Sequence, residues 1–89
     1  MKLVFSDQAW DDYLWWQSPG REKGLERVND IIKATRRTPF KGIGKPEPLK
    51  GDLAGWWSRR ITDEHRFVYR VSGKGDAQRL EIAQLRYHY

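Results

Sequence analysis

A run of glycines and prolines between Phe40 and Gly55 divides the chain into two halves with different patterns. No helical or strand-like spacing of apolar residues survives in this segment, so the sequence predicts a loop of about fifteen residues. Loops of that length in compact domains are usually either functional or disordered. Prolines on both sides of Glu47 restrict the backbone and favour a held conformation. The breaking residues are Gly42, Gly44, Pro46, Pro48, Gly51 and Gly55.

The half before the loop has the spacing of a short strand and two helices. Residues 3–5 form the predicted strand, and Ser6 is a suitable N-cap for a helix over residues 7–17. A break at Ser18-Pro19-Gly20 separates it from a second helix over residues 21–35, which Gly24 weakens by about 1 kcal/mol relative to alanine. Helical spacing is shown by Trp10, Tyr13, Leu14 and Gln17, with Trp10 expected in the core, and by Leu25, Val28, Ile31 and Ile32.

The half after the loop has the composition of β-strands. Strands are predicted over residues 57–61, 66–71 and 80–87, joined by turns at residues 62–65 and 72–76. They would form a three-stranded antiparallel meander. The chain is therefore expected to be one α+β domain over residues 1–89, with the two helices packed on one face of the sheet. Of the adjacent Trp56 and Trp57, we expect one in the core and one exposed.

Positive charge is concentrated in the middle of the chain. Lysine and arginine together number 17 against 12 acidic residues, which gives a net charge of +5. A cationic segment of this density favours a polyanionic partner through phosphate contacts. A solvated basic face without a partner would have the same composition. Between Ile31 and Gly51 the acidic Glu47 stands among Lys33, Arg36, Arg37, Lys41, Lys45 and Lys50.

The composition also excludes several classes of protein. Cysteine is absent, and His65 and His88 are the two histidines, so neither a disulfide framework nor a zinc site made of protein ligands is expected. No apolar run reaches the roughly 18 residues of a membrane span, and the first residues lack the apolar core of a signal peptide. The sequence therefore predicts a cytoplasmic protein with no membrane partner, no metal and no cofactor.

The few residues able to transfer protons are consistent with metal-independent cleavage of RNA. That reaction needs a base for the 2′-hydroxyl, an acid for the leaving 5′-oxygen, and cations for the phosphorane. Glu47 is the candidate base, and His88 the candidate acid. Arg60 and Arg66, at facing ends of two predicted strands, can bind phosphate. Each also has a plainer interpretation, namely a surface carboxylate, a frayed terminal histidine or solvated arginines, and His65 is expected to shape its turn.

Six short segments, spread from one end of the chain to the other, form a more specific pattern. They are Trp10–Leu14, Thr35–Phe40, Gly44–Lys50, Trp57–Thr62, Glu64–Arg66 and Arg86–Tyr89. Together they resemble the YoeB/Txe family of type II toxins, which belongs to the RelE/ParE superfamily. The resemblance implies a RelE-like α+β fold and a toxin that binds the ribosomal A site and cuts messenger RNA there. It also implies inhibition by an antitoxin of the YefM/Phd type, a homodimer, and binding of operator DNA by the toxin–antitoxin complex.

By matching positions, the resemblance assigns Glu47 as the general base and His88 as the general acid. Arg66 would stabilise the phosphorane, and Tyr89 would position the RNA or the leaving group. The chain departs from the family pattern in a longer last turn at residues 74–76 and in Leu85, and neither lies among the assigned positions. Further phosphate contacts would come from Lys45, Lys50 and Arg60.

Two other functions fit the same fold or the same charge. A RelE/ParE-type protein that only binds, such as a gyrase-directed toxin, would lack nuclease residues, and Glu47, Arg66 and the His88-Tyr89 pair argue against it. A basic RNA-binding module would bind naked RNA without cutting it and would not need Glu47. Incubation with translating ribosomes separates these functions, because only the enzyme leaves cleaved message.

Overall fold

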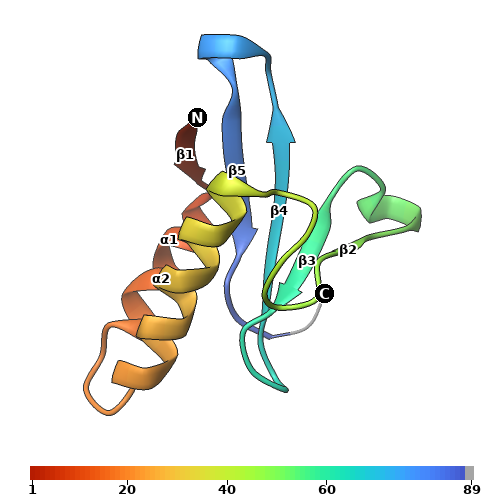
Figure 1. The fold of residues 1–89 in the computed structure, drawn as a ribbon. Helices are drawn as coiled ribbons and strands as arrows, with labels where there is room; N and C mark the ends of the chain where they lie inside the picture. Colours follow the sequence, from red (N-terminus) through yellow and green to blue (C-terminus); the bar gives the residue numbers. More distant parts are fainter. Residues whose placement is uncertain (88–89) are drawn as a thin grey trace.

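The computed structural model describes residues 1–87 as two helices and a five-stranded mixed sheet (Figure 1). The predicted α+β class and both helices are confirmed. No helix in these residues is long and apolar enough to cross a membrane. The elements are β1 (Lys2–Phe5), α1 (Asp7–Trp16), α2 (Glu22–Arg37), β2 (Glu47–Pro48), β3 (Trp57–Arg60), β4 (Arg66–Ser72) and β5 (Arg79–Gln84), with 3-10 turns at Gly51–Leu53 and Gly75–Ala77.

The sheet is larger than the sequence predicts. Its strand order is β1-β5-β4-β3-β2, and the predicted meander β3-β4-β5 forms its centre. β1 pairs in parallel with β5, and β2, from within the expected loop, pairs antiparallel with β3. A two-residue strand is too short to show a period, and Pro48 is tolerated because β2 lies at the edge of the sheet. The prediction of continuous loop over residues 40–55 was therefore wrong at β2 and at the 3-10 turn after it.

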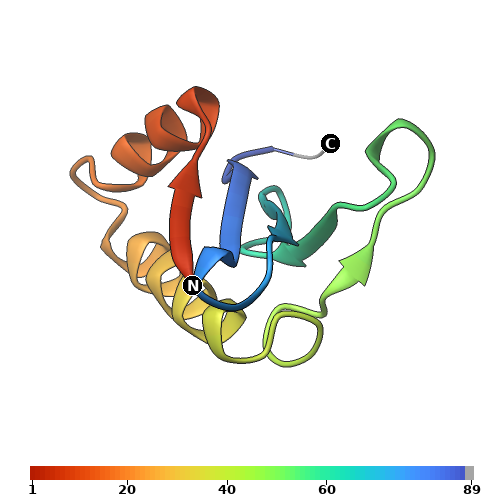
Figure 2. The same cartoon turned by 90° about the horizontal axis from the view of Figure 1, so that it is seen from above.

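Both helices cover the same face of the sheet, as predicted. Figure 2 shows α1 and α2 on one side, with β3 and β2 at the far edge from β1. Alternation along β4 directs Phe67 and Tyr69 toward the helices, where both are fully buried. The core between sheet and helices is therefore continuous, and its other buried members include Val28, Ile31, Ile32, Leu80 and Ile82.

The buried side of α1 differs from the one that apolar spacing indicates. Ala9, Asp12 and Trp16 are buried, whereas Trp10 is 48% exposed and Leu14 is 47% exposed. The prediction that Trp10 lies in the core was therefore wrong. The physical reason is that Asp12 takes an inward position, where its carboxyl group accepts a backbone hydrogen bond from the C-terminal segment.

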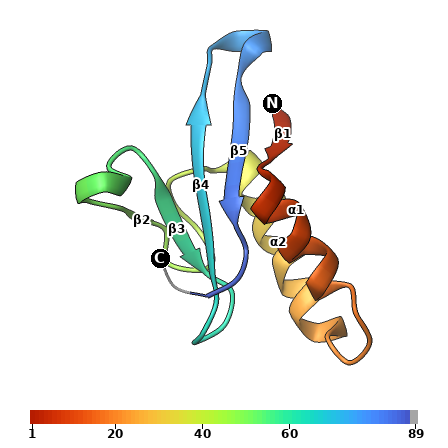
Figure 3. The ribbon, with the colours of Figure 1, turned by 180° about the vertical axis from the view of Figure 1, so that it is seen from behind.

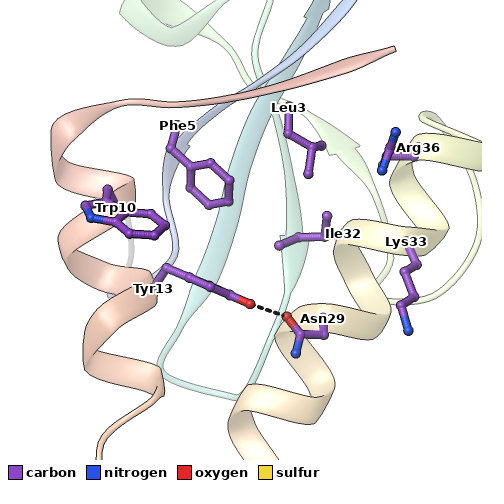
Figure 4. A pocket seen from close by; sticks show the side chains of 8 residues that line it. All are labelled: Leu3, Phe5, Trp10, Tyr13, Asn29, Ile32, Lys33 and Arg36. Atoms are coloured by element: carbon purple, nitrogen blue, oxygen red, sulfur yellow. Dashed lines mark hydrogen bonds between the residues drawn. The ribbon is translucent and has the colours of Figure 1, made fainter.

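Trp10 instead borders an open groove of about 360 Å³ between β1, α1 and α2 (Figure 4). Tyr13 reaches across from α1 to α2, where its hydroxyl donates to the side-chain oxygen of Asn29 at 2.8 Å. Phe5 of β1 meets Trp10 edge to face, with ring centroids 5.8 Å apart. Aromatic residues thus line this groove, and Lys33 and Arg36 add positive charge from α2.

The adjacent Trp56 and Trp57 are both half-buried, so the prediction of one core and one exposed residue was wrong. Trp57 lies against Phe40, with ring centroids 4.7 Å apart. The guanidinium of Arg70 lies 4.5 Å from the centre of the Trp56 ring. Trp57 also packs against the core from its edge, so both indoles lie at the border between core and surface.

Gly24→Ala tests whether packing or helix propensity governs the first turn of α2. Helix propensity alone predicts that the free energy of unfolding rises by about 1 kcal/mol. However, a Cβ at residue 24 would lie 2.2 Å from Cζ3 of Trp16, a buried ring whose Nε1 donates to the Leu85 carbonyl at 2.8 Å. We therefore expect the free energy of unfolding to fall by about 1–3 kcal/mol. Urea denaturation followed by tryptophan fluorescence measures it, and a more stable variant would contradict the packing argument.

Candidate functional site

Strand register gathers three predicted site residues on the face of the sheet opposite to the helices. Directly opposed residues in an antiparallel pair share a face, and so do residues two apart on one strand. Glu47 stands opposite Ser58, and Arg60 stands opposite Arg66. Because Ser58 and Arg60 are two apart on β3, the residues Glu47, Arg60 and Arg66 share one face. The next residue after Arg66, Phe67, faces the core.

The turn between β3 and β4 holds the guanidinium of Arg66. Nη1 of Arg66 donates to the carbonyl oxygens of Thr62 at 2.7 Å, Asp63 at 3.1 Å and His65 at 3.1 Å. Arg60, directly across the ladder, is exposed. The expectation that these two arginines lie close together is confirmed, and a cation fixed in this way needs little reorganisation when a phosphate arrives.

The strand spacing separates the acidic and the basic parts of this face. Neighbouring strands lie about 4.8 Å apart, so β2 and β4, with β3 between them, lie about 10 Å apart. Glu47, Lys45 and Lys50 are exposed along and beside β2. Lys45 has a φ of 52°, in the left-handed region, which costs a non-glycine residue about 1–2 kcal/mol. The backbones that carry Glu47 and Arg66 are thus separated by about 10 Å, with β3 between them.

Arg59 is fully buried and was not singled out by the sequence analysis. Its Nη2 donates to the carbonyls of Thr38 at 2.6 Å and Lys41 at 3.1 Å, and its Nη1 donates to that of Ile43 at 3.0 Å. The guanidinium therefore holds the segment that leads from α2 to β2, and with it the approach to Glu47. Alternation could have revealed it, since residue 59 lies between the inward positions 57 and 61 on the predicted strand.

Tyr69 and Gly44 complete the contact between this segment and the sheet. The Tyr69 hydroxyl accepts from Nε of Arg59 at 3.3 Å and donates to the Pro39 carbonyl. Burial raises the pKa of the Tyr69 phenol above its usual 10.0, and Arg59 offsets part of that rise. Gly44 has a φ of 81°, and a Cβ there would lie 3.0 Å from the Arg59 Cβ. Glycine therefore allows the segment to approach β3 this closely.

Helix α1 holds the C-terminal segment where it leaves the sheet. The Leu85 N–H donates to Oδ2 of Asp12 at 2.9 Å, and the Leu85 carbonyl accepts from Nε1 of Trp16 at 2.8 Å. Both partners are buried. Sequence reasoning assigned no role to Asp12, although a carboxylate between Ala9 and Trp16 on one helix face is the signal that could have revealed it.

The last predicted strand is shorter than expected, since β5 ends at Gln84 and does not reach Tyr87. Tyr87 has a φ of 62°, so the backbone cannot continue as a strand there. Its carbonyl accepts from the Arg66 N–H at 3.1 Å, and Figure 3 shows the chain turning from β5 toward the start of β4. The peptide that precedes residue 88 therefore lies beside Arg66. His88 and Tyr89, the predicted acid and positioning residue, lie outside the described residues.

Replacing Arg59 tests its role in holding residues 38–43. In Arg59→Leu three carbonyls lose the guanidinium as a donor, and that of Lys41 keeps the Thr38 hydroxyl, so we expect the free energy of unfolding to fall by about 2–4 kcal/mol. Tyr69→Phe removes a single hydroxyl and is expected to cost about 1 kcal/mol. Urea denaturation measures both, and amide exchange over residues 38–44 should accelerate more in Arg59→Leu. Equal stability of Arg59→Leu and the wild type would contradict this role.

Comparison with known proteins agrees with this fold over the whole chain. A model of the YoeB-like toxin of bacterial type II toxin–antitoxin systems matches residues 5–89. Toxin YoeB of Shigella flexneri is 55% identical over 89 residues, 100% of each chain. The structure of a YoeB/ParE toxin from Agrobacterium tumefaciens has a TM-score of 0.93 at 62% identity and covers 100% of both chains.

A third relative is YoeB of Staphylococcus aureus, solved as a dimer and in complex with YefM. The two structures have TM-scores of 0.86 and 0.85 at 40% and 41% identity, and the match covers 100% of this chain and 98% of each relative. With a family match over residues 5–89 and full-length relatives at these identities, the chain belongs to the YoeB-like toxin family of bacterial type II toxin–antitoxin systems.

Proposed function

We propose that this protein is a ribosome-dependent endoribonuclease toxin that cuts messenger RNA in the ribosomal A site and so inhibits translation. The observation that carries the proposal is the shared face of Glu47, Arg60 and Arg66. A carboxylate and two guanidinium groups on one face are the groups that cleavage of a phosphodiester needs. Membership of a toxin family and the cationic middle of the chain support the same function.

The reaction is a transesterification that uses protein groups and needs no metal ion or cofactor. Glu47, as general base, takes the proton of the 2′-hydroxyl next to the scissile phosphate. The 2′-oxygen attacks phosphorus, and the bond from phosphorus to the 5′-oxygen of the next nucleotide breaks. His88, as general acid, gives that oxygen a proton. The products are a 2′,3′-cyclic phosphate and a 5′-hydroxyl.

Positive groups stabilise the charge that develops on the phosphorane. Arg66 does so directly, with its Nη1 already fixed by the turn carbonyls. Lys45, Lys50 and Arg60 bind the phosphates on either side, and Tyr89 positions the RNA or the leaving group. The phosphate contacts also explain why a basic protein suits this substrate.

The proposed partners follow from the relatives and from the charge. The protein acts in the cytoplasm on the ribosome and its message, as a homodimer, and an antitoxin of the YefM/Phd type neutralises it. The complex with the antitoxin binds operator DNA. The Staphylococcus aureus relative, solved as a dimer and with YefM, supports the homodimer and the antitoxin.

The chemical ends of the product test the mechanism. Programmed ribosomes incubated with the protein, in a buffer that keeps them intact, should yield message cut in the A site, with a 2′,3′-cyclic phosphate or a 3′-phosphate at the new end. Naked message should stay intact under the same conditions. A free 3′-hydroxyl would overturn the mechanism, because it requires water rather than the 2′-oxygen as the nucleophile.

Variants at the proposed catalytic residues should lose rate and keep the fold. Glu47→Gln and His88→Gln each remove a proton-transfer group, so we expect single-turnover cleavage to fall by about 10²–10⁴-fold. Arg66→Lys should also be slow, since a point charge cannot reproduce a bidentate phosphate contact. Glu26→Gln, which makes the same charge change on the exposed side of α2, is the matched control. Full activity of Glu47→Gln on programmed ribosomes would refute the assigned base.

Neutralisation by the antitoxin should involve the cationic face and the C-terminal segment. A basic, aromatic-rich surface suits an acidic, partly disordered segment that folds as it binds. Amide exchange measured with and without the antitoxin should therefore slow over residues 86–89 and around Glu47. Unchanged exchange in both regions would show that the antitoxin neutralises the toxin elsewhere.

A further inference from the structure

His65 lies between the turn that holds Arg66 and the residues that lead to His88. Its side chain is 8% exposed. The rings of Trp15, Trp16 and Tyr87 surround the imidazole, with centroids 5.5, 5.2 and 5.6 Å away. Nδ1 of His65 accepts the backbone N–H of Tyr87 at 2.8 Å. The imidazole therefore packs as an aromatic ring and also supplies a directed acceptor.

Tyr87 is held at both of its backbone groups. Its N–H donates to His65, and its carbonyl accepts from the Arg66 N–H at 3.1 Å. The φ of 62° is unfavourable for a tyrosine, and such a conformation persists only where surrounding contacts impose it. Docking against the β3–β4 turn, rather than local preference, therefore sets the direction in which the chain continues after Tyr87.

The backbone of His65 takes part in fixing Arg66. Its carbonyl accepts from Nη1 of Arg66 at 3.1 Å and from the N–H of Ile61 at 3.0 Å. His65 thus contacts the guanidinium of Arg66 through its carbonyl and the N–H of Tyr87 through its ring. This arrangement couples the position of the Arg66 guanidinium to that of the Tyr87 backbone.

We propose that His65 is a positioning residue for RNA cleavage: its Nδ1 docks the backbone of Tyr87, the residue before the proposed acid, beside Arg66. The inference rests on the proposed function, because it assigns His65 an effect through the general acid. An apolar side chain would satisfy packing against the surrounding rings. It would, however, leave the Tyr87 N–H without its acceptor, and small displacements of a reacting group are costly in rate.

Two replacements of His65 that are nearly isosteric with each other isolate the role of the hydrogen-bond acceptor. His65→Asn can present its side-chain oxygen near the place of Nδ1, whereas His65→Leu has a similar shape without an acceptor. His65→Phe is a second variant that lacks the acceptor and keeps a ring among Trp15, Trp16 and Tyr87. Thermal melts of all three full-length proteins report folding. Single-turnover cleavage is measured on programmed ribosomes at saturation, so that ribosome affinity does not enter the rate.

We expect His65→Leu and His65→Phe to cut about 10–100-fold more slowly than the wild type, and His65→Asn to stay close to it. Amide exchange at Tyr87 should accelerate in the two slow variants and remain slow in His65→Asn. In a full-length His88→Gln background, which lacks the acid, His65→Leu should lower the residual rate no further. Such non-additivity is expected of a residue that acts through the missing group and not of a merely structural one.

The outcomes separate this inference from the proposed function. Absence of cutting by the wild type would overturn the proposed function, and this inference with it. Cutting by the wild type with equal rates for the Leu, Phe and Asn variants would overturn the inference alone. So would a further loss of rate from His65→Leu in the His88→Gln background, or unchanged exchange at the Tyr87 amide in His65→Leu and His65→Phe.

Discussion

Burying a guanidinium costs free energy unless its N–H groups find acceptors, and Arg59 finds them in the chain that enters the site. Carbonyls at residues 38, 41 and 43 and the Tyr69 hydroxyl surround it. Moving that segment away from β3 would take three carbonyl acceptors from a buried charge. A two-residue strand such as β2 has little stability of its own, so the place of Glu47 depends on this contact more than on its ladder.

The candidate site illustrates how a sheet can assemble chemistry that no local motif contains. Glu47 and Arg66 are nineteen positions apart in the sequence, and the register of β2, β3 and β4 alone puts them on one face. The opposite face of the same strands belongs to the core. Along each strand, core-facing residues therefore alternate with residues of the candidate site. A shift of the pairing by one residue would exchange these two groups of side chains.

Apolar spacing predicted both helices, the central meander and the side of the sheet that the helices cover. The same spacing gave a wrong prediction at several places where a polar group is buried. Asp12 faces inward because the Leu85 N–H, far along the chain, is its partner, and this rotates α1 so that Trp10 is exposed. Arg59 and the early end of β5 depend in the same way on partners distant in sequence. The residues proposed for catalysis were identified from their chemistry and from the family resemblance. The residues that hold them were not singled out from the sequence, because their partners lie far along the chain.

The parallel pairing of β1 with β5 affects when the molecule can fold. The Ser6 hydroxyl, at the start of α1, donates to the carbonyl of Ala83. The side chains of Asp12 and Trp16 form hydrogen bonds with the backbone of Leu85. Residues near the start of the chain thus bind residues 83 and 85, and contacts so distant in sequence form late. During synthesis, a nascent chain cannot close its sheet before residue 85 has emerged. A nascent chain that has emerged only as far as β4 therefore lacks the partner of β1, and β1 joins the sheet only after β5 has left the ribosome.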